Sequence, residues 1–131
     1  MKFRYKKYAP TIARPVIPIE IRFQGVTVKY EVLVDSGADA NIFEADIADI
    51  LGIDLTSGKK SDVSGITGKS RPYYIHKVDL VIGGHAFKDV EVGFLKEMGA
   101  YGYGVVGQNG FFDLFIVKFD LKKKEIELKP R

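Results

Sequence analysis

The chain has 131 residues and no cysteine, which excludes disulfide bonds and thiolate metal sites. Apolar residues make up 46% of the sequence and charged residues 28%, as in ordinary globular proteins, and the length suits one domain spanning residues 1–131. No apolar run approaches the roughly 20 residues of a membrane span, and no apolar stretch follows the basic start as in a secretory signal. We therefore expect a cytoplasmic protein without a membrane segment.

The net charge of +3 arises mainly at the two ends of the chain, where lysine and arginine crowd residues 2–7 and 122–131. One interpretation is a surface that binds polyanions. Aromatic and aliphatic residues alternate with these charges, however, and this alternation is typical of edge strands with a charged outer face. We therefore expect no nucleic-acid partner.

The first half of the chain predicts a β-hairpin followed by a helix. Residues 15–23 and 26–34 have the alternation of two strands joined by a tight turn, and residues 32–34 are continuously apolar, as in a strand that enters the core. Residues 44–52 predict a helix, because Ile47, Ile50 and Leu51 fall on one face and glycine follows at its end.

The second half predicts mainly further strands. A polar, glycine-bearing stretch over residues 56–70 precedes two strands, 72–82 and 85–95, joined at a Gly-Gly turn. Residues 108–115 suit a short helix, and the strands 116–120 and 125–128 follow it. The sequence thus predicts an all-β, mainly antiparallel fold with one or two short helices and no internal repeat.

Asp35 ends the apolar strand in the stretch VLVDSGADANIF, and three interpretations are open. It can be a turn residue whose carboxylate accepts backbone N–H groups. It can begin a calcium-binding loop, although the sixth position of that loop is Ala40, where glycine is needed. It can also be catalytic, because the small residues after it leave room for a substrate and Gly37 lets the backbone turn its N–H groups toward the carboxylate.

An apolar strand ending in Asp-Ser-Gly-Ala precedes a helix ending in Leu-Gly, the glycine-rich segment SGITGKS follows, and YGVVGQNGFFDLF comes about seventy residues after Asp35. These three motifs, in this order, resemble those of the retropepsin-like aspartic proteases. The closing IVKFDLKKKEIELKP is also similar to the end of such domains. The resemblance implies a retropepsin-like half-barrel that needs no metal or other cofactor.

The resemblance also implies an aspartic endopeptidase that is active as a homodimer, because the chain holds a single Asp-Ser-Gly and the family uses two aspartates. Asp35 of each copy would be catalytic, activating a water molecule to hydrolyse a peptide bond of a peptide or protein substrate. The alternative is a non-catalytic module with the same fold that binds an extended peptide or only dimerises.

Further roles follow from the resemblance by matched position. Ser36, Gly37 and Ala38 would complete the active-site loop, with Ser36 bonding across the dimer axis. The substrate would contact Asp39 and a flap made of Gly65, Ile66, Thr67 and Gly68. A supporting loop behind the site would consist of Val105, Val106 and Gly107.

The sequence departs from the family at Gln108, where retroviral members usually have an arginine that pairs with the acid at the Asp39 position. Among the remaining candidates, we interpret His76 and His85 as surface or packed histidines rather than metal ligands. Tyr101 and Tyr103 belong either to a glycine-flexed loop with aromatic packing or to the wall of the cleft.

Overall fold

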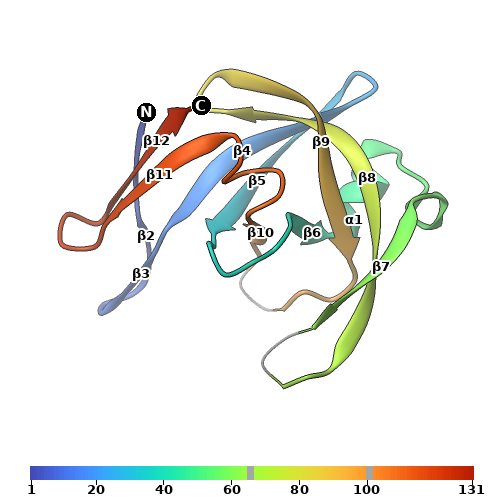
Figure 1. The fold of residues 1–131 in the computed structure, drawn as a ribbon, viewed down its shortest axis with the longest axis horizontal. Helices are drawn as coiled ribbons and strands as arrows, with labels where there is room; N and C mark the ends of the chain where they lie inside the picture. Colours follow the sequence, from blue (N-terminus) through green and yellow to red (C-terminus); the bar gives the residue numbers. More distant parts are fainter. Residues whose placement is uncertain (65–66, 100–101) are drawn as a thin grey trace.

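The structure is a computed structural model that describes residues 1–64, 67–99 and 102–131. Most of the described chain is β-strand (Figure 1). The elements in chain order are β1 (Lys2–Arg4), β2 (Lys6–Ala9), β3 (Ile12–Arg14), β4 (Val16–Phe23), β5 (Val26–Val34), β6 (Ile42–Glu44), α1 (Ala45–Leu51), the 3₁₀ helix η1 (Leu55–Ser57), β7 (Lys59–Ser64), β8 (Ser70–Ile82), β9 (His85–Leu95), β10 (Gly104–Val106), β11 (Phe115–Asp120) and β12 (Glu125–Pro130).

The largest sheet runs in the order β4-β5-β10-β6-β9-β8-β7, and β4 also pairs with β8. This second pairing curls the sheet back on itself, so the apolar side chains of its inner face form the core. Most neighbours are antiparallel, whereas β10 pairs in parallel with β5 and β6 pairs in parallel with β9. The all-β, mainly antiparallel fold predicted from the sequence is confirmed.

The expected hairpin of β4 and β5 is present, with a tight turn between Phe23 and Val26. Gln24 and Gly25 have φ angles of 46° and 84°, and two successive positive values are what a type I′ turn requires. Val32 and Val34 are buried at the far end of the hairpin. The continuous apolar run therefore does carry β5 into the core just before Asp35.

The predicted helix is confirmed as α1, which ends at Gly52 in the left-handed conformation with φ of 78°. Ile47 and Leu51 are buried against the sheet. Ile50 is 60% exposed, so its assignment to the buried face was wrong. In a helix this short, Ile47, Ala48 and Leu51 already cover the contact with the sheet.

The predicted helix over residues 108–115 is wrong, because this segment forms a series of hydrogen-bonded turns. The N–H groups of Phe112 and Asp113 donate to carbonyl groups five residues earlier, at Gly107 and Gln108, and not four as in an α-helix. Gly110 has a φ of 103°, which no helix contains, and its N–H is capped by the Asp113 carboxylate.

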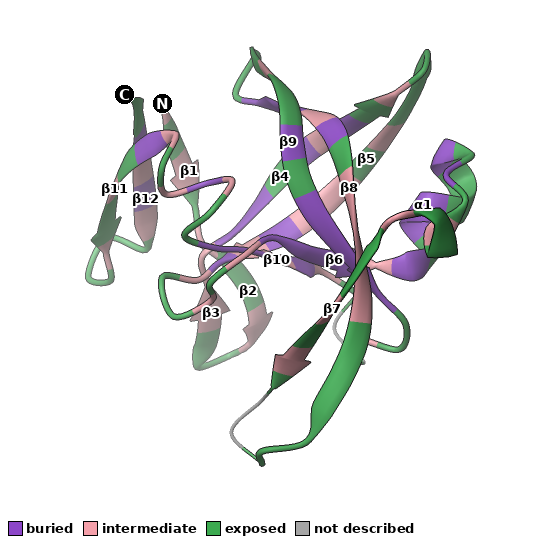
Figure 2. Ribbon diagram, turned by 45° about the vertical axis from the view of Figure 1, so that its right-hand side comes forward, coloured by how far each residue is buried: buried purple, intermediate pink, exposed green. Residues whose placement is uncertain are grey.

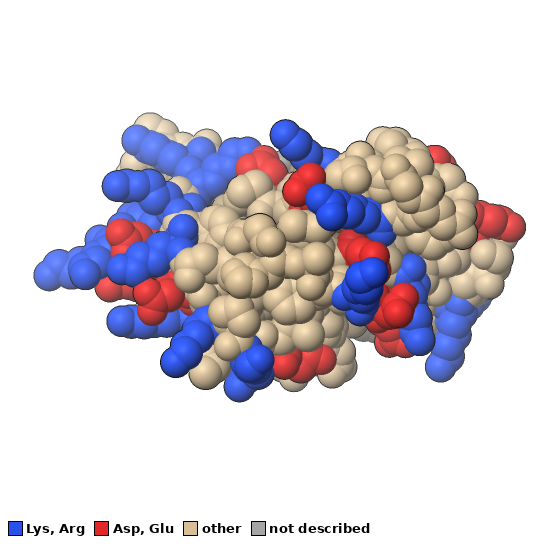
Figure 3. Space-filling model, turned by 90° about the horizontal axis from the view of Figure 1, so that it is seen from above, with Lys and Arg blue, Asp and Glu red and all other residues tan. Residues whose placement is uncertain are grey.

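The two ends of the chain meet in a three-stranded sheet of order β1-β12-β11. The expectation that both ends are edge strands is therefore right for β1 and wrong for β12, which lies between two partners. Figure 3 shows Lys and Arg side chains gathered at one end of the molecule, with acidic side chains among them. Lys2 lies 3.8 Å from Glu127 across this sheet, so part of the basic surface is locally neutralised.

Two further features of the fold bear on the site. The outer part of the β7–β8 hairpin is exposed and extends away from the core (Figure 2). The β2–β3 hairpin forms a separate two-stranded sheet. Within the described ranges, we find no helix of the length and apolarity that a bilayer crossing needs.

Candidate active site

Asp35 lies directly after β5, half-buried, where the sheet is interrupted by a loop that leads to β6. Strand β10 fits between β5 and β6, so the chain around residue 106 lies beside the start of this loop. The Asp35 N–H donates to the carbonyl oxygen of Val106 at 3.0 Å. The sheet therefore fixes the backbone of Asp35 while its side chain emerges at the edge of the core.

The loop after Asp35 is a tight turn held by its own hydrogen bonds. The Gly37 N–H donates to Asp35 Oδ1 at 2.9 Å, the contact that the resemblance implies. The Ala38 N–H donates to the Asp35 carbonyl oxygen at 3.1 Å. A side chain at Gly37 would bring its Cβ to 3.2 Å from Asp35 Oδ1, a tight approach, so glycine suits a position this close to the carboxylate.

The loop after β10 braces the Asp35 loop from behind. The N–H of Gln108 donates to the carbonyl oxygen of Ala38 at 2.9 Å, and Gln108 Nε2 donates to that of Ser36 at 3.0 Å. Any Cβ at Gly107 would lie 2.5 Å from the Ala38 oxygen, so the two loops approach too closely for a side chain there. Gln108, which departs from the family pattern, therefore binds the backbone of the Asp35 loop.

Asn41 is a residue that the sequence analysis missed, and it is fully buried between the two loops. Its Oδ1 accepts the N–H of Gly107 at 3.1 Å, and its Nδ2 donates to the carbonyl oxygen of Gly110 at 3.1 Å. The Gly93 N–H also donates to the Asn41 carbonyl oxygen, at 2.8 Å. Asn41 thus joins the Asp35 loop to the loop after β10 and to β9.

Tyr30 supports the floor of the site from β5. Its ring lies edge-on against Phe43, with centroids 5.3 Å apart, and its hydroxyl accepts the N–H of Glu44 at 3.2 Å. Burial raises the pKa of the Tyr30 phenol. A Cβ at Gly104 would lie 2.7 Å from the Tyr30 ring, so glycine permits β10 to approach β5 and β6.

The residues expected to meet a substrate fall into two groups. Ser36, Gly37 and Asp39 are exposed on the Asp35 loop, and Ala38 is half-buried. Thr67 and Gly68 are exposed in the connection between β7 and β8, where Gly68 has a φ of 76°. The other two residues of the expected flap, Gly65 and Ile66, lie outside the described residues.

The three residues expected to form a supporting loop lie in β10 and directly after it. Val106 and Gly107 are buried, whereas Val105 is only partly covered. Val105 pairs with Leu33 of β5 on one side and with Ile42 of β6 on the other. The apolar pair therefore lies in β10, between β5 and β6.

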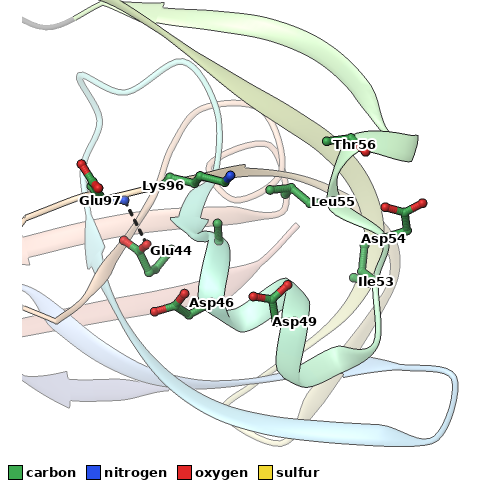
Figure 4. Close-up of a pocket in the computed structure, with 10 residues that line it drawn as sticks. Glu44, Asp46, Asp49, Ile53, Asp54, Leu55, Thr56, Lys96 and Glu97 are labelled. Atoms are coloured by element: carbon green, nitrogen blue, oxygen red, sulfur yellow. Dashed lines mark hydrogen bonds between the residues drawn. The ribbon is translucent and has the colours of Figure 1, made fainter.

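A separate hollow of about 540 Å³ lies beside α1 (Figure 4). Carboxylates dominate its lining, and Glu44 accepts the N–H groups of Glu97 and Met98 at 3.1 and 2.9 Å. No residue of the Asp35 loop lines this hollow. We place the candidate site at Asp35 and not in this hollow, because a catalytic centre is defined by its reacting groups and their geometry and not by the volume of a cavity.

Two aromatic candidates from the sequence have packing contacts. The Nε2–H of His76 donates to the Leu55 carbonyl oxygen at 2.8 Å, and its ring lies 5.9 Å from that of Phe94, which confirms it as a packed histidine. Tyr103 is half-buried with its ring edge-on to Tyr8 at 5.8 Å. His85 is exposed, and Tyr101 lies outside the described residues.

Comparison with known proteins gives the family. Residues 19–109 match the family model described as aspartyl protease, and this range includes the Asp35 loop and the start of the loop after β10. The chain belongs to the aspartyl protease family. A search of curated proteins finds no match.

Two solved structures show the fold of this aspartyl protease family member to be retropepsin-like. A retropepsin-like aspartic protease from Rickettsia conorii aligns with a TM-score of 0.67 and 19% identity, covering 98% of this chain and 89% of that one. EIAV protease, solved in complex with the inhibitor HBY-793, aligns with a TM-score of 0.51 and 19% identity, covering 78% of this chain and 88% of that one.

Proposed function

We propose that this chain is an aspartic endopeptidase that acts as a homodimer, with Asp35 from each copy as the catalytic pair. The observation that carries the proposal is Asp35 itself, a half-buried residue whose carboxylate accepts the Gly37 N–H at 2.9 Å, on one of two loops that are hydrogen-bonded to each other. The sequence contains this Asp-Ser-Gly motif once, so a two-carboxylate site requires two copies. A two-fold axis brings the same residue from both copies together.

Two carboxylates about 3 Å apart do not both ionise readily, so the pair shares one proton over a range of pH. The ionised carboxylate takes a proton from a water molecule, whose oxygen attacks the peptide carbonyl carbon. The protonated carboxylate donates its proton to the carbonyl oxygen. Proton transfer to the nitrogen then accompanies cleavage of the C–N bond.

The surrounding residues have supporting roles in this proposal. Gly37 and Ser36 sit on the exposed side of the loop, where the second copy and the substrate would approach. Asp39 would bind the substrate backbone, and the β7–β8 connection that includes Thr67 and Gly68 would cover it. The complex of EIAV protease with an inhibitor supports a ligand-binding cleft in this fold.

The test compares Asp35→Asn with Asp46→Asn, which changes an exposed carboxylate on α1 in the same way. Both variants should remain folded dimers by sedimentation. Cleavage of a peptide library should fall by at least about a thousandfold for Asp35→Asn and stay unchanged for Asp46→Asn. Wild-type activity should be limited to a mildly acidic range, because the pair must hold one proton, and a transition-state mimic with a central hydroxyl should inhibit it.

Unchanged cleavage by Asp35→Asn would refute the catalytic assignment. Cleavage should be assayed between pH 3.5 and 8, from just below the pKa of ~4 of a free carboxyl group to just above neutral pH. A wild-type dimer that binds extended peptides but cleaves none of them in this range would favour the non-catalytic peptide-binding module.

A further inference from the structure

The β2–β3 hairpin, residues 6–14, stands apart from both larger sheets. Over the described ranges, its two strands pair only with each other. Figures 1 and 2 both show it projecting from the body of the protein. A lone two-stranded hairpin is marginally stable at best in water, so contacts with other parts of the protein must hold it in place.

One face of the hairpin is fixed to the domain. Lys6 forms an ion pair with Glu31 of β5. The Tyr8 ring lies edge-on against Tyr103, with centroids 5.8 Å apart, and the Arg14 guanidinium lies 4.9 Å from the centre of the Tyr8 ring. The Lys6–Glu31 and Tyr8–Tyr103 contacts join the hairpin to β5 and to the segment just before β10, whereas the Arg14–Tyr8 contact lies within the hairpin.

The hairpin is attached next to Asp35. The Val34 N–H donates to the Pro15 carbonyl oxygen at 2.9 Å, which extends the antiparallel β4–β5 pairing by one step. Arg14, the last residue of the hairpin, directly precedes Pro15, and Asp35 directly follows Val34. The hairpin therefore flanks the loop that the proposed dimer brings to its two-fold axis.

We propose that the β2–β3 hairpin is an intersubunit arm that packs against a second copy of this chain beside the paired Asp35 loops. The proposal rests on the homodimer proposed above, and it assigns that dimer a contact surface. The second copy is the expected occupant because the site is incomplete without it and the arm is fixed where the copies would meet.

The solvent side of the arm has the chemistry of such a contact. Ile12 is 43% exposed, and the turn residues Pro10 and Thr11 beside it are exposed as well. Lys7 is exposed as well.

The test is Ile12→Lys, matched by Ile50→Lys, which changes a 60% exposed isoleucine on α1, on the opposite side of the molecule from the arm (Figure 1). The dimer dissociation constant is measured by sedimentation velocity over a dilution series. We expect Ile12→Lys to weaken the dimer about thirtyfold, since an isologous interface carries the substitution twice and loses apolar burial at each place. Its activity should recover at high protein concentration, and Ile50→Lys should match wild type.

Amide hydrogen exchange supplies a second measurement that needs no substitution. Residues 6–14 should exchange more slowly in the concentrated dimer than in the diluted monomer. A dimer constant unchanged by Ile12→Lys, with equal exchange in both states, would overturn the arm and leave the proposed dimer intact. A wild-type protein that is monomeric at every concentration would overturn both.

Discussion

Replacement of Asn41 by alanine tests whether one buried amide holds the two loops of the site together. The change removes the acceptor of the Gly107 N–H and the donor to the Gly110 carbonyl, both at 3.1 Å, and a longer contact of 3.4 Å to the Glu91 carbonyl. The buried Gly107 N–H and the partly buried Gly110 carbonyl are left without these partners, at about 1–3 kcal/mol each. We expect a loss of about 3 kcal/mol in the free energy of unfolding.

The assay is urea denaturation followed by circular dichroism, with Asn109→Ala as the matched control. Asn109 is exposed, and its N–H bond to the Asp39 carbonyl at 2.9 Å survives the substitution, so we expect a change within about 0.5 kcal/mol. A loss below about 1 kcal/mol for Asn41→Ala would refute the reasoning, because it would mean that the amide bonds contribute no more than a typical surface contact.

Asn41→Asp tests the direction in which the free energy of unfolding changes with pH. The new carboxylate keeps an acceptor for the Gly107 N–H but faces the Gly110 carbonyl, to which only the protonated acid can donate. Folding therefore favours the protonated form and raises the pKa of the introduced acid above its unfolded value of about 3.9. The stability of this variant relative to wild type should fall as the pH rises above about 4.

Two further predictions concern the loop behind Asp35. Gly107→Ala should prevent stable folding or abolish activity, because its Cβ would lie 2.5 Å from the Ala38 carbonyl oxygen; a soluble variant with wild-type activity and thermal midpoint would contradict this. Gln108→Ala removes the 3.0 Å bond to the Ser36 carbonyl at an exposed position, so we expect a stability loss of only about 1 kcal/mol with a several-fold fall in kcat. If thermal unfolding shows that Gln108→Ala is folded and its kcat equals that of wild type, this bond does not order the loop.

The sequence predicts the fold best where a local pattern decides the outcome. The turn at Gln24-Gly25 and the end of α1 at Gly52 follow from residues that tolerate positive φ, and both are present. The segment over residues 108–115 has helix-compatible side chains, yet Gly110 adopts a φ of 103° because its neighbours bind the Asp35 loop. Tertiary contacts override local propensity there.

Asn41 shows why part of the candidate site could not be predicted. Its side-chain partners at Gly107 and Gly110 lie 66 and 69 positions away in the sequence, and one buried amide produces no periodic signal. The position of β12 between β1 and β11 could not be predicted either. An alternating pattern distinguishes the two faces of a strand, but it does not distinguish an edge strand from an inner strand.

The insertion of β10 between β5 and β6 has a consequence for biosynthesis. The strand that completes the sheet behind Asp35 is made long after the two strands it separates, so a nascent chain cannot form the braced loops until residues 104–110 have left the ribosome. Pairing between such distant segments is also slow, because the intervening chain must be ordered first. Translation that stops before residue 104 therefore yields fragments in which the Asp35 loop has no second loop to brace it.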